Sequence, residues 1–404
     1  MRAAASTAPA GAQRPQRRLL WKLGAALGGV VLGLVICEGL LRRFYFSDHD
    51  YFVWPPQLRR VLDMAPGRLP GVAGTGEFRT NSLGMRGDEL QPSHTHALLA
   101  VGGSTTECYV LDQPKTWPAR LQAKLNAQRG DQSVWVGNIG MSGRKAPHHV
   151  LQLRYLLPHL PQIQTVLVLT GINDLSLRLS HDDYRPQSLT SADFEDEYID
   201  AAFMIHPRRV FAGPAWYRRL ALWQWAYLLY SRQDVARERH RVPGGYETYR
   251  QHRRQATAIR RTLPDLTDAI NEYRLEVEDM IATARAHGRR LIFLTQPTLW
   301  KAGLSPDLEA LLWLGGVGDF QVESEHEYYS VEALAQGMDL YNAALVETCR
   351  KYQIEVIDLA AQLPKDTTVF YDDCHFNETG AEQVAQIIAN YLIEHRQSGR
   401  DGAQ

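Results

Sequence analysis

From residue 97 onward, short apolar runs alternate with longer amphipathic segments, and this alternation limits the possible folds more than any other feature. Short, uninterrupted apolar runs are typical of strands buried on both faces, as in a parallel sheet. We predict strands over residues 97–101, 134–138, 165–169, 290–294 and 354–359. We predict helices over residues 117–127, 148–157, 265–287, 338–352 and 378–395. The alternation predicts an α/β fold, a three-layer α/β/α sandwich around a mainly parallel central sheet.

Two long segments, at about 176–264 and 301–336, interrupt this alternation within a domain that we expect to span residues 96–398. Both are rich in Trp, Tyr and Arg, and the first is too long to be a plain connection. We interpret them as helical insertions that cover the functional site. A separate domain is the alternative.

The N-terminal region contains an apolar run over residues 19–41, in which only Lys22 and Glu38 are charged. A helix needs about 20 apolar residues to cross a membrane, so the run predicts one transmembrane helix. The tail before it, residues 1–18, is rich in Ala and Arg and is expected to be disordered and cytoplasmic, because positive charge favours that side. The remainder would then be periplasmic or extracellular. Residues 44–95, with many prolines and glycines, predict an irregular stalk or collar.

Two alternatives to a membrane anchor remain for the apolar run. A cleaved signal peptide is disfavoured because no small-x-small cleavage site follows the run. A lipid-anchored Cys37 is disfavoured because Ile36 stands where such sites have a small residue. We therefore expect the protein to bind the membrane through its N-terminal helix.

The composition argues against several classes of partner. The net charge is -1 and 22% of the residues are charged, which gives no reason to expect a nucleic-acid partner. The four cysteines form no Cys-x-x-Cys pair, so neither a disulfide-built scaffold nor a structural zinc site is predicted. His148 and His149 lack carboxylate or cysteine companions and lie on a predicted helix surface. We expect no metal and no cofactor.

Polar residues follow successive strands of the predicted sheet, where ligands of open α/β sheets bind. Ser104 follows the first strand in "GGSTTE", Gly140 the second in "GNIGMSG", and Asn173 the third in "TGINDL". Asp372 and His375 precede the last helix in "FYDDCHFNETG". Each fragment alone has a bland explanation, as a turn, a helix cap or a surface histidine. Together, and in this order, they point to one site.

Ser104, His375 and Asp372 are the residue types of a serine catalytic triad. A serine hydroxyl is a poor nucleophile until a base takes its proton, and the His375 imidazole titrates near neutrality. Asp372 precedes this histidine by three residues and can fix its tautomer and orientation. Asp373 is the alternative if the turn is shifted by one residue.

Ser104 has a second interpretation as a helix cap. Its spacing to Glu107 is that of a capping box, in which two side chains satisfy backbone N–H groups at a helix start. The two roles are compatible, because the start of a helix favours negative charge. We predict that Ser104 is both cap and nucleophile.

The four fragments resemble the conserved blocks of the SGNH hydrolases, the GDSL esterase/lipase family, and the resemblance spans residues 98–395. The stretch "RTNSLGMRGDE" (79–89) also resembles a segment that precedes this domain in membrane-anchored bacterial members. Gly103 is a departure, because the family's usual form is Gly-Asp-Ser. The resemblance implies an ester hydrolase whose oxyanion hole consists of the Ser104 and Gly140 N–H groups and the Asn173 amide.

Cys108 and Cys374 are expected to lie close together if Ser104 meets His375. Cys108 follows Ser104 by one helical turn, and Cys374 adjoins the histidine. In an oxidising compartment the pair is a possible disulfide. Two buried free thiols are the alternative. Cys349 lies in a predicted helix and is expected in the core.

The expected reaction is hydrolysis of acyl esters, short ones such as acetyl above all, through an acyl-enzyme. An exported, membrane-tethered site with aromatic insertions suggests acylated envelope carbohydrate or lipid as the substrate. Sugars could stack on aromatic residues of the insertions, although core packing is the alternative: Trp216, Trp223, Trp225 and Trp300. An O-acyltransferase acting on exported polysaccharide and a non-catalytic glycan-binding module are the competing functions.

Overall fold

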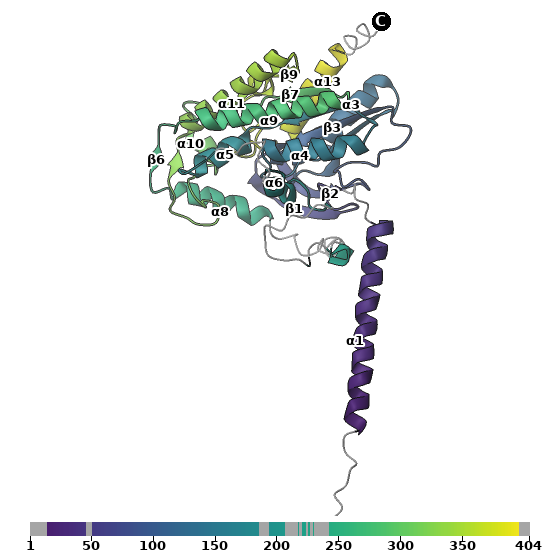
Figure 1. Ribbon diagram of the computed structural model, residues 1–404. Coiled ribbons are helices and arrows are strands. Elements are labelled where there is room, and N and C mark those ends of the chain that lie inside the picture. The colour runs from purple at the N-terminus through teal and green to yellow at the C-terminus, as the bar shows by residue number, and fades with distance from the viewer. Residues whose placement is uncertain are drawn as a thin grey trace, which may run out of the picture.

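The structure is a computed structural model that describes residues 14–45, 51–185, 194–206, 217, 220–223, 225–226, 229 and 242–395. Its centre is a five-stranded parallel sheet with the order β4-β3-β5-β7-β9 (Figure 1). The strands are β3 (His96–Gly102), β4 (Val134–Asn138), β5 (Ile163–Leu169), β7 (Arg290–Leu294) and β9 (Glu355–Ile357). The predicted α/β fold and parallel sheet are therefore confirmed.

Two groups of helices cover this sheet (Figure 1). Helix α3 (Trp117–Arg129) packs against α13 (Glu378–Glu394). The second group is α4 (Ala146–Leu156), α9 (Thr267–Ala286) and α11 (Val331–Tyr352), in which α9 contacts both others. Each of these helices matches a predicted one. Helix α11 begins seven residues before the predicted start at 338, because the Ser330 side chain caps it by accepting from Ala333 N.

The carboxyl end of the sheet is where the chain leaves each strand toward a helix. Strand β3 leads into the short helix α2 (Ser104–Glu107), and β5 leads into α5 (Ile172–Ser180). Strand β9 is shorter than predicted because Asp358 caps helix α12 (Leu359–Gln362) by accepting from Ala361 N. Residues at this edge, far apart in sequence, therefore approach one another.

The region predicted to be an irregular collar contains an antiparallel β-hairpin, which corrects that prediction. Strand β1 (Arg59–Leu69) pairs with β2 (Val72–Arg79). Just beyond it, the fully buried Arg86 donates from its guanidinium to the backbone oxygens of Glu107, Cys108 and Leu111. Burial lowers the pKa of Arg86 to about 10. These bonds attach the N-terminal region to the loop after α2.

The first insertion is described in part. It contains α6 (Phe194–Ala202), α8 (Val242–Arg254) and β6 (Ile259–Arg260). The second insertion contains α10 (Pro306–Glu309) and β8 (Tyr328–Tyr329). Strands β6 and β8 pair in parallel, so the two insertions are joined to each other. Trp216 lies outside the described residues.

The N-terminal helix α1 (Arg14–Leu40) extends away from the domain (Figure 1). Its segment Leu20–Phe44 has a mean hydropathy of 2.0 and is long and apolar enough to cross a membrane. Membrane anchors and signal sequences share this property. Residues 14–18, predicted to be disordered, belong to the helix, and residues 1–13 of the predicted tail lie outside the described residues.

Candidate active site

Ser104 and His375 meet at the carboxyl end of the sheet, although 270 residues separate them in the chain. The Nε2 atom of His375 lies 2.7 Å from the Oγ of Ser104. On the other side of the ring, Nδ1 lies 2.8 Å from each carboxylate oxygen of Asp372. The three groups form a continuous chain of hydrogen bonds from carboxylate to hydroxyl. This is the geometry in which a histidine can take a proton from serine.

The Asp372 carboxylate is fully buried and surrounded by donors. It accepts from Trp313 Nε1 at 2.9 Å and from the backbone N–H groups of Cys374 and His375. Burial alone would raise its pKa, but the His375 charge and these hydrogen bonds outweigh burial and hold the pKa below its usual value. The carboxylate therefore stays ionised inside the protein.

The His375 imidazole is buried between aromatic rings. The Tyr371 ring lies nearly parallel to it at 5.5 Å between centroids, and the Trp313 ring lies nearly parallel at 6.3 Å. Burial disfavours the imidazolium, but the negative charge of Asp372 outweighs burial and raises the pKa of His375 well above its usual value. The site thus stabilises the proton that the histidine would hold during ester cleavage.

Asp373 has a different environment from its neighbour. Its carboxylate accepts from the backbone N–H groups of Trp313 and Leu314 and from Trp300 Nε1. Burial and the charge of Asp372 raise its pKa. Because His375 pairs with Asp372 instead, Asp373 anchors the second insertion to the histidine loop. Trp300 is buried in this role and is unavailable to stack on a sugar.

A cavity of about 590 Å³ opens in front of the serine and histidine. Gly143 and Asn173 line it together with Ser104 and His375. The aromatic rings of Tyr246, Tyr249, Trp313 and Phe320 form much of its remaining wall. The insertions that supply these rings therefore cover the site, as the sequence analysis expected.

Gly140, the predicted second-block oxyanion donor, does not line this cavity. It is buried behind the serine, and its N–H donates to Asn138 Oδ1 at 2.8 Å. A Cβ at this position would lie 2.2 Å from Glu107 N, so glycine is required for packing. Gly143 is the exposed glycine of the same block, with φ of +74°. The prediction selected the glycine that packs, and the structure places Gly143 at the cavity.

Asn173 lies beside the loop that carries Ser104, as predicted. Its Nδ2 donates to Arg144 O at 2.8 Å, which leaves its second N–H available. A Cβ on Gly103 would lie 2.5 Å from this Nδ2. The Gly-Gly-Ser form of the chain is thus matched to the position of the Asn173 amide, and an aspartate at 103 would require that amide to move.

Ser104 is not a helix cap, which corrects the capping-box prediction. Helix α2 has Gly103 at its N-cap position and no side-chain cap, and the Ser104 hydroxyl faces His375 instead. Glu107, the expected partner, accepts from Ser142 Oγ at 2.5 Å. This bond ties helix α2 to the loop that carries Gly143.

The structure also bears on the predictions made for the cysteines and for His148 and His149. Cys108 and Cys374 are buried free thiols, so the structure contains that alternative and not the disulfide. Cys108 Sγ instead donates to Thr105 O at 3.4 Å, in the turn after α2. His148 and His149 are both buried, contrary to the predicted surface position, because α4 is covered by α6 and α9. Cys349 lies in the core, as expected.

Asp372, Cys374 and His375 also offer three possible metal ligands within 4.8 Å of one another. Metal ions bind the thiolate form of cysteine. Burial, however, raises the pKa of the Cys374 thiol to about 11, and the Nδ1 atom of His375 is held by Asp372. Asp372 and His375 therefore suit their hydrogen-bonded chain with Ser104 better than a metal site.

Trp313 and Tyr246 were not predicted from the sequence. Gly143 stands in the second block beside Gly140, but the sequence analysis gave the oxyanion role to Gly140. Trp313 and Tyr246 come from the two insertions, whose residues have no regular spacing relative to the strands. Their contacts with Asp372 and the His375 ring depend on tertiary packing.

The model of the GDSL-like lipase/acylhydrolase family matches residues 100–383 of the chain. Among solved structures, similar ones include the carbohydrate acetylesterase Est24 from Sinorhizobium meliloti, with 12% identity and a TM-score of 0.37 over 74% of this chain and 99% of that one. The aryl esterase of M. smegmatis has 12% identity and a TM-score of 0.38 over 74% and 99% of the two chains. No curated protein sequence matches significantly.

Proposed function

The chain belongs to the GDSL-like lipase/acylhydrolase family, and we propose that it is a serine esterase that removes short acyl groups, such as acetyl, from envelope carbohydrate or lipid. The observation that carries the proposal is the hydrogen-bonded chain from Asp372 through His375 to Ser104, at the mouth of a cavity. Ser104 is the proposed nucleophile, His375 the base, and Asp372 the residue that orients and charges the histidine.

The proposed reaction has two steps. The Ser104 Oγ attacks the ester carbonyl carbon while its proton passes to His375 Nε2, and the tetrahedral intermediate then expels the alcohol, which leaves with that proton. In the second step a water molecule gives a proton to His375 and attacks the acyl-enzyme. The acid is released, and the proton returns to the serine oxygen. Asp372 stays ionised throughout.

The negative oxygen of the tetrahedral intermediate needs hydrogen-bond donors. We assign this task to the N–H groups of Ser104 and Gly143 and to Asn173 Nδ2. Gly143 and Asn173 line the cavity beside the serine, and the Gly143 N–H donates to no acceptor among the described residues. Gly143 therefore takes the role that the sequence analysis gave to Gly140.

The proposed location follows from the N-terminal helix. Arginines precede the apolar segment, and this arrangement favours a cytoplasmic N-terminus with the catalytic domain, residues 96–398, in the periplasm or outside the cell. Helix α1 would then hold the domain beside the membrane, with the β1–β2 hairpin between them. Envelope esters are the substrates within reach of such a site.

The test is hydrolysis of a short-chain aryl ester by the full-length protein in detergent, compared with its Ser104→Ala variant. We expect a loss of at least about a thousandfold, on the scale known for triad removal. Equal rates would contradict the proposal. Transfer of acetyl to an added glycan in preference to water would replace esterase by O-acyltransferase, with the same catalytic residues.

A further inference from the structure

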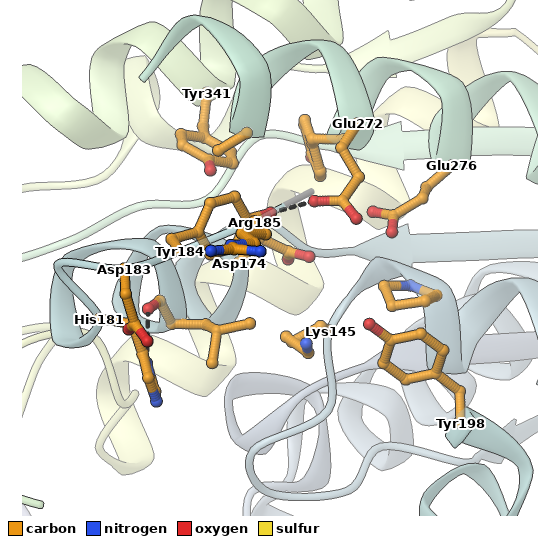
Figure 2. Close-up of a pocket in the computed structure, with 14 residues that line it drawn as sticks. Lys145, Asp174, His181, Asp183, Tyr184, Arg185, Tyr198, Glu272, Glu276 and Tyr341 are labelled. Carbon is orange, nitrogen blue, oxygen red and sulfur yellow. Dashed lines mark hydrogen bonds between the residues drawn. The ribbon is translucent and has the colours of Figure 1, made fainter. Parts of the chain in front are cut away.

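Figure 2 shows a second cavity, which has a volume of about 310 Å³. The two cavities share Lys145 and Leu177 in their walls. Two consecutive residues of α5 face different cavities: Asn173 lines the catalytic cavity, and Asp174 lines the second one. A group attached to a substrate at Ser104 therefore has a neighbouring space to enter, of a size that suits a small ligand.

The wall of this second cavity is acidic. It carries the carboxyl groups of Asp174, Asp183, Glu272 and Glu276, against the positive charges of Lys145 and Arg185. The inner carboxylates come from two elements, with Glu272 and Glu276 on α9 and Asp174 on α5. The excess of negative charge favours a cation as the ligand.

Glu276 is the residue that distinguishes this cavity from a cluster of paired surface acids. Its side chain is 4% exposed, and Figure 2 shows its carboxylate directed into the cavity. No described residue donates a hydrogen bond to it, whereas Asp174 accepts from Ala146 N and Glu272 accepts from Tyr184. A buried carboxylate without donors is costly, so it is retained only where something else compensates for it.

Tyr341 provides a second observation of the same kind. It is 1% exposed, its hydroxyl points into the cavity in Figure 2, and no described residue hydrogen-bonds to that hydroxyl. Tyr198 contributes another aromatic wall, and the Lys145 ammonium lies 5.0 Å from the centre of its ring. The faces of aromatic rings attract ammonium groups, and a nearby carboxylate supplies an opposite charge.

We infer that this cavity binds an ammonium group carried by the substrate, such as the amino group of an amino sugar whose ester is cleaved at Ser104. Glu276 is the main counter-charge, and Tyr341 and Tyr198 surround the group. Lys145 lies at the boundary of both cavities, and its positive charge also acts on Glu276 and Asp174. This inference rests on the proposed function and narrows its substrate class to esters of amino-bearing carbohydrate.

Burial and the charges of Asp174 and Glu272 raise the pKa of Glu276 well above its usual value. Burial likewise raises the pKa of Asp174 to about 6. A bound ammonium group would offset both effects, because an opposite charge nearby favours the ionised carboxylate. The raised pKa values of these two carboxyl groups are therefore consistent with a cationic ligand.

The test measures equilibrium binding to the full-length Ser104→Ala protein, so that no result depends on hydrolysis. Glucosamine and glucose are titrated by calorimetry, because they have the same ring and differ by one ammonium group. We expect glucosamine to bind at least tenfold more tightly than glucose. Adding Glu276→Gln should remove most of this preference, whereas Glu278→Gln, on the same helix and paired with Lys351, should keep it.

Equal binding of the two sugars, or an unchanged preference in Glu276→Gln, would overturn the inference. Absence of glucosamine binding at millimolar concentrations would overturn it as well. Far-UV circular dichroism of each variant confirms that the fold is kept. A protein that binds glucosamine but hydrolyses no ester would contradict the proposed function and leave the cation site standing, so the two failures are distinguishable.

Discussion

The pKa values of two buried carboxyl groups, one beside each of the neighbouring cavities, are shifted in opposite directions. Behind the His375 wall of the cavity at Ser104, Asp372 accepts hydrogen bonds from Trp313, Cys374 and His375, and its pKa lies below the usual value. In the second cavity, Glu276 accepts none from the described residues, and burial raises its pKa. Both side chains are almost inaccessible to solvent, so burial does not explain the difference. The charge of His375 and the hydrogen bonds to Asp372 lower the pKa of that group, whereas the charges of Asp174 and Glu272 raise the pKa of Glu276.

This difference indicates what each carboxylate is prepared for. A carboxylate with all its donors in place is fixed and charged before the substrate arrives, as electrostatic preorganisation requires. A carboxylate without donors lowers the stability of the folded protein until a ligand supplies the missing charge.

The largest expected effect is that of Asp372→Asn. We expect kcat to fall by about a thousandfold to ten-thousandfold, because the histidine loses its orienting charge. In the unchanged protein, kcat/KM should rise with pH through a midpoint above the ordinary histidine value of about 6.5, since the neutral imidazole is the base and its pKa is raised. The variant's midpoint should move to lower pH. The measurement is a pH–rate profile of both proteins.

Asp373→Asn is the matched comparison for that variant. Its carboxylate holds the backbone of Trp313 and Leu314 and does not contact the imidazole. We therefore expect a lower Tm and an unshifted midpoint. A midpoint that moves as far as in Asp372→Asn would show that the two carboxylates had been assigned the wrong roles.

The next largest effect is that of Asn173→Ala. Removing one oxyanion donor should lower kcat by about a hundredfold to a thousandfold with little change in KM. Gly103→Ala should act through the same amide, because its Cβ would displace Asn173 Nδ2. The two losses should therefore not add in the double variant, as steady-state kinetics can measure. If the losses in kcat added fully in the double variant, Gly103→Ala would act through a group other than the Asn173 amide.

Trp313→Phe should have a smaller effect, of about tenfold in kcat. The change removes the Nε1 donor to Asp372 and keeps an aromatic ring beside the imidazole. Losing one of several donors to a buried carboxylate costs about 1–3 kcal/mol, part of which appears as lower stability. Kinetics and thermal unfolding together measure both parts. If kcat and Tm were both unchanged, the hydrogen bond from Trp313 would not be needed to hold Asp372.

The smallest expected effect is a gain in stability from Glu276→Gln, of about 1 kcal/mol at neutral pH. The pKa of Glu276 is higher in the folded protein than the value near 4.3 of an unfolded chain. The free energy of unfolding is therefore highest below pH 4.3, and it falls as the pH rises toward the pKa of the folded protein. The advantage of the variant should therefore grow from pH 5 to pH 8. Denaturant unfolding at both pH values measures it, and an advantage that shrinks would contradict the assigned shift.

The sheet and its main helices could be predicted from the sequence because their signals are local. The strands from 134–138 and 290–294 have the predicted bounds, since uninterrupted apolar runs mark strands buried on both faces. The hairpin β1–β2 was missed because its glycines and prolines obscure any alternation of apolar and polar residues.

The predicted site residues show the same division. Ser104, Asn173, Asp372 and His375 were identifiable because each belongs to a short motif at the end of an element. The sequence could not decide between Gly140 and Gly143 as oxyanion donor. The structure shows that the Gly140 N–H already donates to the Asn138 side chain. No local sequence motif marks Glu276. Its burial depends on the packing of α5 and α11 against α9, which the sequence of α9 alone does not show.

The central claim is that Ser104 is a nucleophile activated by His375. The most direct measurement is labelling of the folded full-length protein with a fluorophosphonate, followed by intact mass and peptide mapping. We expect one adduct on Ser104, none in Ser104→Ala, and much slower labelling in Asp372→Asn. A folded protein that stays unlabelled, or that carries the adduct on another residue, would contradict the account.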